Sequence, residues 1–308
     1  MRTLKREIVN WQLRTRALEL GVRTLVMAVV NLTPDSFSDG GAYGTTEAAM
    51  ARCLQSLDEG ADILDLGAEG TRPGSRAGGA EGTPDAPAVS ADEEQARLLP
   101  VLEGILRVRP DAVISVDTYK AATARAALGA GAEIVNDVSG FTWDAAMPRV
   151  CAELRCGVVL MHTRGRPEQW RAQEQAAPDA LLAMVRDGLA VSLATARAAG
   201  VNDDAIVLDP GYGFGKRFDE NYALLARQAE LLSLGRPLLA GLSRKSFLGH
   251  TLAPLNGGMP AVPLQRETAS IAAQVAAILH GASIVRVHAV RPAVEAARIS
   301  DVVLGAAQ

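Results

Sequence analysis

Cysteine is scarce in this chain, and its spacing argues against two kinds of cross-linked structure. The three cysteines are Cys53, Cys151 and Cys156. An odd number without a Cys-x-x-Cys pair argues against a disulfide framework and against a cysteine-based zinc site. Because unpaired cysteines are typical of reducing compartments, we expect a cytoplasmic protein.

Blocks of positive charge are also missing. Lys and Arg number 31 and Asp and Glu number 35, which gives a formal net charge of −4, and both signs are spread along the chain. A nucleic-acid-binding surface needs a basic patch or stripe. The charge pattern therefore predicts no nucleic-acid partner.

Uninterrupted apolar stretches long enough to span a bilayer are absent as well. The segment 268–285 carries no formal charge, but Gln274, His280 and Gly281 interrupt it. An amphipathic helix followed by a strand explains this segment better than a membrane span does. Near the N-terminus, polar residues within 10–16 prevent a signal-peptide core from forming. We expect no membrane association.

What the chain does contain is material for a large core, since 48% of its residues are apolar and 21% are charged. Short apolar runs recur from one end of the chain to the other. Near-continuous runs of this kind are typical of parallel strands that are covered on both faces. The eight predicted strands are 25–30, 62–66, 112–116, 132–136, 157–161, 205–208, 237–240 and 284–287.

Segments rich in Ala and Leu lie between these runs and have helical character. They include 46–59, 93–108, 120–128, 177–199, 221–232 and 267–280. Eight strands alternating with helices predict an α/β fold, a single (β/α)8 TIM barrel, over residues 25–308. Residues 1–24 precede the first barrel strand and are predicted to form a short N-terminal hairpin or cap. A doubly wound open sheet is the structural alternative.

Polar side chains at the ends of the predicted strands favour the barrel. Any one of them could be a helix N-cap. In a barrel, however, all strand ends meet at one mouth, where active sites lie, whereas an open sheet scatters most of them along an edge. The polar residues at these ends are Asn31, Asp65, Asp117, Asn136, His162, Asp209, Ser243 to Ser246, and His288.

Three of these residues suggest a ligand. Asp117, Asn136 and Asp209 present acceptor oxygens that suit the amino and ring N–H donors of a flat heterocycle such as a pterin. The same oxygens are ligands for a divalent metal. We favour the pterin, because the nearby cation Lys245 would compete with a metal.

A basic group accompanies these acceptors and consists of Lys245, Arg286 and His288. The two-residue period of a strand places Arg286 and His288 on the same side. Cations that bind a pyrophosphate also stabilise it as a leaving group, so the substrate is expected to carry phosphate. Ser-Arg-Lys-Ser opens a short helix whose amides, with Ser246, suit a carboxylate. The segment 211–216 does not have Walker spacing.

Seven segments combine these polar residues with glycines and prolines, and they span roughly residues 25 to 290. They are Asn-Leu-Thr-Pro-Asp-Ser-Phe-Ser-Asp-Gly-Gly at 31–41, Thr-Arg-Pro-Gly at 71–74, Ser-Val-Asp-Thr at 115–118, Asn-Asp-Val-Ser-Gly at 136–140, Asp-Pro-Gly-Tyr-Gly-Phe-Gly-Lys at 209–216, Ser-Arg-Lys-Ser-Phe-Leu-Gly at 243–249 and Arg-Val-His at 286–288. Taken together and in this order, they resemble the dihydropteroate synthase family. Two departures stand out: Gly-Ala-Glu-Gly-Thr at 67–71 replaces Gly-Gly-Glu-Ser-Thr, and Ala289 replaces the Asp that usually follows the last histidine.

The resemblance implies a role for each matching position. The residues implied to bind the pterin are Asp117, Asn136, Met161, Asp209, Lys245 and Arg286. Those implied to bind the pyrophosphate are Asn31, Asp65, Thr71, Arg286 and His288, with Mg²⁺ at Asn31. Those implied to bind p-aminobenzoate are Phe37, Thr71, Arg72, Pro73, Phe214 and Ser246. The implied catalytic residues are Lys245, Asp39, Asp117 and Asp209.

The activity implied by the resemblance is the condensation of 6-hydroxymethyl-7,8-dihydropterin pyrophosphate with p-aminobenzoate in folate biosynthesis. Pyrophosphate leaves first, and the aniline nitrogen captures the pterin-methyl cation. The family also implies a homodimer and sensitivity of the pocket to sulfonamides. Two alternatives remain open. One is a pterin-binding methyltransferase that transfers a methyl group from methyltetrahydrofolate to a corrinoid, and the other is a non-catalytic pterin-binding protein on the same barrel.

Overall fold

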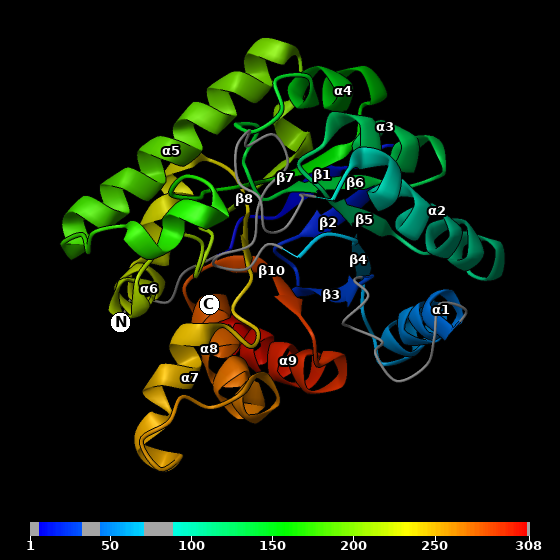
Figure 1. The fold of residues 1–308 in the computed structure, drawn as a ribbon. Helices are drawn as coiled ribbons and strands as arrows, with labels where there is room; N and C mark the ends of the chain where they lie inside the picture. The colour runs from blue at the N-terminus through cyan, green and yellow to red at the C-terminus, as the bar shows by residue number, and fades with distance from the viewer. Residues whose placement is uncertain (1–5, 33–43, 71–88, 307–308) are drawn as a thin grey trace.

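A closed eight-stranded parallel barrel forms the centre of the molecule, with helices around it (Figure 1). The computed structural model describes residues 6–32, 44–70 and 89–306. Strands follow one another around the barrel in chain order, and the last pairs with the first, in the order β10-β3-β4-β5-β6-β7-β8-β9. The predicted fold class is confirmed, and the open-sheet alternative is wrong, because β10 pairs with both β3 and β9.

The barrel strands lie close to the predicted runs. They are β3 (Leu25–Asn31), β4 (Ile63–Gly67), β5 (Ile114–Asp117), β6 (Ile134–Asp137), β7 (Gly157–Met161), β8 (Ile206–Asp209), β9 (Leu238–Ala240) and β10 (Ala282–Val287). The α-helices that cover them are α1 (Gly44–Asp58), α2 (Ala91–Val108), α3 (Ala121–Gly129), α4 (Met147–Leu154), α5 (Pro178–Ala199), α6 (Phe218–Ala226), α7 (Ser246–Thr251), α8 (Glu267–Leu279) and α9 (Val290–Ala306).

One predicted helix, 221–232, is wrong as a single element. The structure divides it into α6 and the 3-10 helix η4 (Gln228–Leu234), with Arg227 between them at φ −113° and ψ 9°. The break has a partner that is distant in sequence. The buried Gln228 side chain donates to the carbonyl oxygens of Ala277 and His280 at the end of α8. Residues so far apart in the chain cannot be paired by a local helical pattern.

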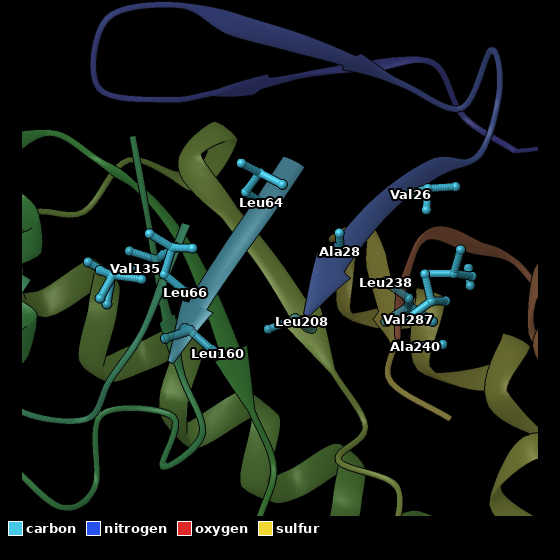
Figure 2. Close-up of a cluster of buried hydrophobic side chains, with 14 of the residues drawn as sticks. Val26, Ala28, Leu64, Leu66, Val135, Leu160, Leu208, Leu238, Ala240 and Val287 are labelled. Atoms are coloured by element: carbon cyan, nitrogen blue, oxygen red, sulfur yellow. The ribbon is translucent and has the colours of Figure 1, made fainter. Parts of the chain in front are cut away.

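The strand period of two divides the apolar residues into two cores. Side chains such as Val26, Ala28, Leu64 and Leu66 belong to the core between the strands and the helices (Figure 2). The alternate positions, Met27 and Ile63 among them, belong to the core inside the barrel. Each strand therefore buries both faces, which explains why it reads as a continuous apolar run.

A two-stranded antiparallel hairpin, β1 (Val9–Gln12) and β2 (Ala17–Leu20), precedes the barrel. Trp11 is buried with the interior barrel residues, and its indole nitrogen donates to the carbonyl oxygen of Ala205 at 2.8 Å. Ala205 directly precedes β8, so the hairpin covers the end of the barrel at which the strands begin. Over the described residues, no helix has the length and apolarity to cross a membrane.

Candidate active site at the barrel mouth

Alternate residues of each strand point into the barrel, and this alternation, the inward parity, brings the predicted site residues together. Met27, Ile63 and Ile134 point into the barrel, so every second residue after them points inward too. That parity includes most of the polar residues predicted at the strand ends, and it excludes their immediate neighbours. The residues that share the inward parity are Asn31, Asp65, Asp117, Asn136, Met161, Asp209, Arg286 and His288.

Parallel register then arranges three of these positions, together with Gly67, in one row. Asn31 is paired with Gly67, Gly67 with Asp117, and Asp117 with Asn136. Gly67 leaves space in this row, because a Cβ atom there would lie 3.3 Å from the Cβ of Asp117. The row therefore presents an amide, a gap, a carboxylate and a second amide at the mouth.

Asp65 lies one layer deeper and holds two members of the mouth in place. Its Oδ2 accepts hydrogen bonds from the Nε of Arg286 at 2.6 Å and from the Nδ2 of Asn136 at 3.0 Å. The residue has no exposed surface. Because this carboxylate lies beneath the mouth and already faces a cation, its position does not support the predicted contact with pyrophosphate. Its geometry is that of a positioning residue.

Arg286 connects the two carboxylates Asp65 and Asp117. Its Nη2 lies 2.6 Å from the Oδ2 of Asp117, and the two contacts occupy different nitrogens of one guanidinium. The carboxylates raise the pKa of Arg286, although burial opposes them. Burial raises the pKa of Asp117 to about 7 and outweighs the opposing pull of Arg286. A carboxyl group with such a pKa both accepts and donates protons near neutrality.

Asp209 faces the same space from the opposite side of the barrel. Its Oδ1 accepts the backbone N–H of Gly211 at 2.7 Å, which leaves Oδ2 toward the interior. A Cβ atom on Gly241 would lie 3.8 Å from that Oδ2 and 4.0 Å from the Cβ of Arg286. Asp209 and Arg286 therefore both approach the position of Gly241, which contributes no side chain between them. Burial raises the pKa of Asp209.

Lys245 lies beside the aromatic wall of the mouth. Its ammonium nitrogen is 3.9 Å from the centroid of the Phe214 ring, within cation–π range. Phe214 in turn packs edge-on against Trp170, with 5.1 Å between the ring centroids. Burial lowers the pKa of Lys245 to about 7. Phe214 also packs against a small cluster that contains Met161, so the aromatic wall and the predicted pterin floor are continuous.

His288 has a hydrogen-bond partner, although Ala289 stands where the family usually has Asp. Ser243 Oγ accepts the backbone N–H of His288 at 3.2 Å and lies 3.0 Å from its ring nitrogen Nδ1. A hydroxyl that accepts the amide proton can still donate its own proton to Nδ1; in that tautomer the ring proton lies on Nε2. Burial, reinforced by four cations, lowers the pKa of His288 to about 3, so the ring is neutral.

The remaining predicted residues lie either at the edge of the mouth or outside the described part of the chain. Ser246 is the first residue of α7 and is exposed, directly after Lys245. Asn31 ends β3 and is half-buried. Within residues 6–32, 44–70 and 89–306, the structure contains no group of three or more His, Cys, Asp or Glu that could hold a metal ion. The predictions for Phe37, Asp39, Thr71, Arg72 and Pro73 fall outside the described residues.

Two positions carry roles that the sequence reasoning missed. Asp137, beside Asn136, has the outward parity, and its carboxylate accepts the backbone N–H groups of Ser139 and Phe141. It therefore shapes the loop after β6. Ser243 was assigned only to a carboxylate-binding turn. The lack of Asp at 289 was the available signal that His288 needed another partner, but the sequence does not show that Ser243 lies within reach.

Comparison with known proteins agrees with this geometry. Residues 27–288 match the family described as "Pterin binding enzyme". A dihydropteroate synthase of Bacillus subtilis is 40% identical over 288 residues, which covers 94% of this chain and 91% of that protein. Two solved structures also match: Xanthomonas albilineans dihydropteroate synthase with 7,8-dihydropteroate (TM-score 0.80, 37% identity, 96% and 98% coverage) and Yersinia pestis dihydropteroate synthase with a sulfonamide drug complex (TM-score 0.84, 36% identity, 96% and 100% coverage). The chain therefore belongs to the pterin-binding enzyme family and, within it, to the dihydropteroate synthases.

Proposed function

We propose that this enzyme condenses 6-hydroxymethyl-7,8-dihydropterin pyrophosphate with p-aminobenzoate to give 7,8-dihydropteroate and pyrophosphate. The observation that carries the proposal is the convergence of Asp117, Asn136, Asp209 and Arg286 on the inward face of four different strands. Three acceptor side chains and one planar cation suit a flat heterocycle rich in N–H donors.

In this proposal the pterin lies across the row at the mouth. Asp117, Asn136 and Asp209 accept from its amino and ring N–H groups, with Met161 beneath it. The guanidinium of Arg286 lies on the ring face, and it keeps that orientation because Asp65 and Asp117 bind two of its nitrogens. We assign Asp65 to positioning Arg286 and Asn136.

The pyrophosphate is proposed to lie toward His288, Arg286 and Asn31. The neutral His288 offers one ring N–H to a phosphate oxygen, and the surrounding cations favour the polyanionic leaving group. A lone amide oxygen at Asn31 fits a Mg²⁺ ion that keeps its waters and binds mainly through phosphate oxygens. When bound, such an ion neutralises charge on the departing pyrophosphate.

The aromatic amine is proposed to enter between Phe214 and Lys245, with its carboxylate toward Ser246. Departure of pyrophosphate leaves a pterin-methyl cation, and the aniline nitrogen captures it. A closed site that excludes water protects such a cation from hydrolysis. The roles of Phe37, Asp39, Thr71, Arg72 and Pro73 stay predictions from the resemblance.

Two further expectations stay proposals. A second copy of the chain is proposed as the partner, and four exposed apolar side chains between α7 and α8 support an interface there, namely Leu255, Met259, Val262 and Leu264. A cytoplasmic location is proposed because all three cysteines are free thiols and are buried.

A single assay tests the proposed reaction. Purified protein receives the dihydropterin pyrophosphate with and without p-aminobenzoate in the presence of Mg²⁺, and both pyrophosphate and dihydropteroate are measured. We expect equal amounts of the two products, and both must depend on enzyme. Pterin binding without product at saturating substrates would favour a non-catalytic binding protein. Methyl transfer from methyltetrahydrofolate to a corrinoid would favour the methyltransferase.

A further inference from the structure

Lys216 lies behind the aromatic wall of the mouth, and the residue has no place in the reaction described above. We propose that Lys216 is a positioning residue that fixes the loop 211–215, and through Phe214 the pocket for the aromatic amine. This inference rests on the proposed function only for the name of the substrate that the pocket receives.

The Lys216 ammonium group binds carbonyl oxygens of two different loops. Its Nζ lies 2.8 Å from the carbonyl oxygen of Gly211, 3.2 Å from that of His162 and 3.4 Å from that of Phe214. His162 follows β7, whereas Gly211 and Phe214 follow β8. An ammonium group has three N–H donors, one for each of these acceptors. Lys216 thereby ties together the two loops that follow Met161 and Asp209.

Lys216 adds to the restraints on a loop whose glycines make the backbone permissive; the others include the bonds from Gly211 N–H to Asp209 and from Gly213 N–H to Asn221. Gly211, Gly213 and Gly215 all have positive φ, at 70°, 81° and 70°. Three glycines in five residues give the unbound chain many alternative conformations. At Gly211 the space is also closed, since a Cβ atom would lie 2.0 Å from the carbonyl oxygen of His162. The lysine therefore acts with Asp209 and Asn221 to select one conformation of a glycine-dependent loop.

The conformation of this loop decides where the aromatic wall lies. Phe214 is the loop residue whose ring stands 3.9 Å from the Lys245 ammonium and edge-on to Trp170. A Cβ atom on Gly213 would lie 3.3 Å from the Cδ of Lys245, so the backbone itself packs against that lysine. If the carbonyl oxygens of Gly211 and Phe214 lost the ammonium group, only backbone N–H donors would hold them, and the ring and the Lys245 side chain would shift together.

Burying the Lys216 ammonium group costs desolvation free energy, which argues that this cation has a specific role. Lys216 is 7% exposed, and within the described chain its ammonium forms no direct ion pair with a carboxylate. Asp209 and Glu220 attract the charge from a distance, while Lys245 and Arg164 repel it, and burial lowers the pKa of Lys216 to about 7. An apolar side chain would fill the same volume without this penalty, but the carbonyl oxygen of His162 would lose its ammonium donor, and those of Gly211 and Phe214 would keep only backbone N–H donors.

The test compares Lys216→Met, which keeps the length and removes the donors, with Lys216→Gln, which keeps two N–H donors. Steady-state kinetics are measured separately for each substrate, and folding is followed by circular dichroism. We expect Lys216→Met to raise the KM for p-aminobenzoate about tenfold or more, since three bonds to a charged donor are lost. The KM for the dihydropterin pyrophosphate should rise less than that for p-aminobenzoate, and Lys216→Gln should recover part of the loss.

Trp11→Phe is the matched control, because it removes a buried N–H donor to a carbonyl oxygen at the opposite end of the barrel. It should lower stability without raising the KM for p-aminobenzoate. Equal increases in both KM values, an unchanged KM in Lys216→Met, or failure of both Lys216 variants to fold would each overturn the proposal, because Lys216 would then serve the whole barrel or nothing. Failure of the proposed function is distinct, since the unsubstituted protein would form no product.

Discussion

Arg286 Nη2 lies 2.6 Å from Asp117 Oδ2, although 169 residues separate the two in the chain. Arg286 belongs to β10 and Asp117 to β5, and β3 and β4 stand between these strands in the barrel. The contact therefore crosses the barrel interior. It brings a cation from the pyrophosphate side of the proposed site to a carboxylate from the pterin side, and it makes the two half-sites one electrostatic unit.

Substitution of Asp65 tests whether that unit depends on the buried carboxylate. Asp65→Asn keeps the shape but leaves Arg286 with one carboxylate instead of two. We expect kcat/KM to fall about a hundredfold or more, because Arg286 and Asn136 lose the carboxylate that orients them, and a misplacement of about 1 Å can cost about a hundredfold in rate. Stability should fall as well, and urea unfolding would measure that loss separately.

Asp62 provides the control for this experiment. It lies just before the same strand, and it binds Arg23 at the surface. Asp62→Asn removes a carboxylate–arginine pair about as local to β4, but at the opposite end of the barrel. It should leave kcat/KM unchanged within about twofold. A comparable loss of activity in both variants would show that the effect of Asp65 is not specific to the mouth.

Lys245 is expected to be the most sensitive single cation. Lys245→Ala should reduce kcat by on the order of a hundredfold or more, because it removes a preorganised charge from a site that is largely shielded from water. Single-turnover measurements with both substrates would separate this effect from product release. An unchanged rate would contradict the assignment of Lys245 to catalysis.

Burial of the Lys245 charge should also make the free energy of unfolding of the ligand-free protein depend on pH. Burial lowers the pKa of Lys245 to about 7 in the folded protein, against 10.5 for a free lysine. Below pH 7 the group is charged in both states, and folding bears the full desolvation cost. Between pH 7 and 10.5 only the unfolded chain holds the proton, so the stability contribution of the lysine improves as pH rises.

The prediction is that Lys245→Met is more stable than the unsubstituted protein, and that its advantage is largest below pH 7 and shrinks toward pH 10. Urea unfolding of both proteins at pH 6 and pH 9 measures the difference, in which the contribution of Lys216 cancels to first order. An advantage that grows with pH would mean that Lys245 is not buried as a cation.

Sulfonamides should inhibit the enzyme in competition with p-aminobenzoate. The basis is the aromatic wall of Phe214 beside Lys245 and the hydroxyl of Ser246, which suit an arylamine with an anionic substituent. Increasing p-aminobenzoate should restore the rate at a fixed sulfonamide concentration. Inhibition that does not respond to p-aminobenzoate would place the drug elsewhere.

Much of this site could be predicted from the sequence because strand periodicity is local. Asp117, Asn136 and Asp209 end apolar runs, and a closed barrel requires such ends to meet. Contacts across the barrel could not be predicted in the same way. Asp65 has the same inward parity as Asp117, but only the barrel closure shows that Arg286 and Asn136 use its carboxylate.

The error over the predicted helix 221–232 and the missed role of Ser243 have the same origin. The break at Arg227 follows from the binding of Gln228 to the end of α8, about fifty residues further on. Ser243 likewise serves His288, which lies 45 residues away. In each case a hydrogen bond to a residue distant in the sequence fixes the side chain, and no pattern within one segment identifies that residue.

The most direct test of the account is a crystal structure of the protein with a bound pterin analogue. We predict that the ring lies at the barrel mouth, with its amino and ring N–H groups on Asp117, Asn136 and Asp209, and with the Arg286 guanidinium on its face. A ring bound anywhere else, or a ring at the mouth that contacts none of these three acceptors, would contradict the account.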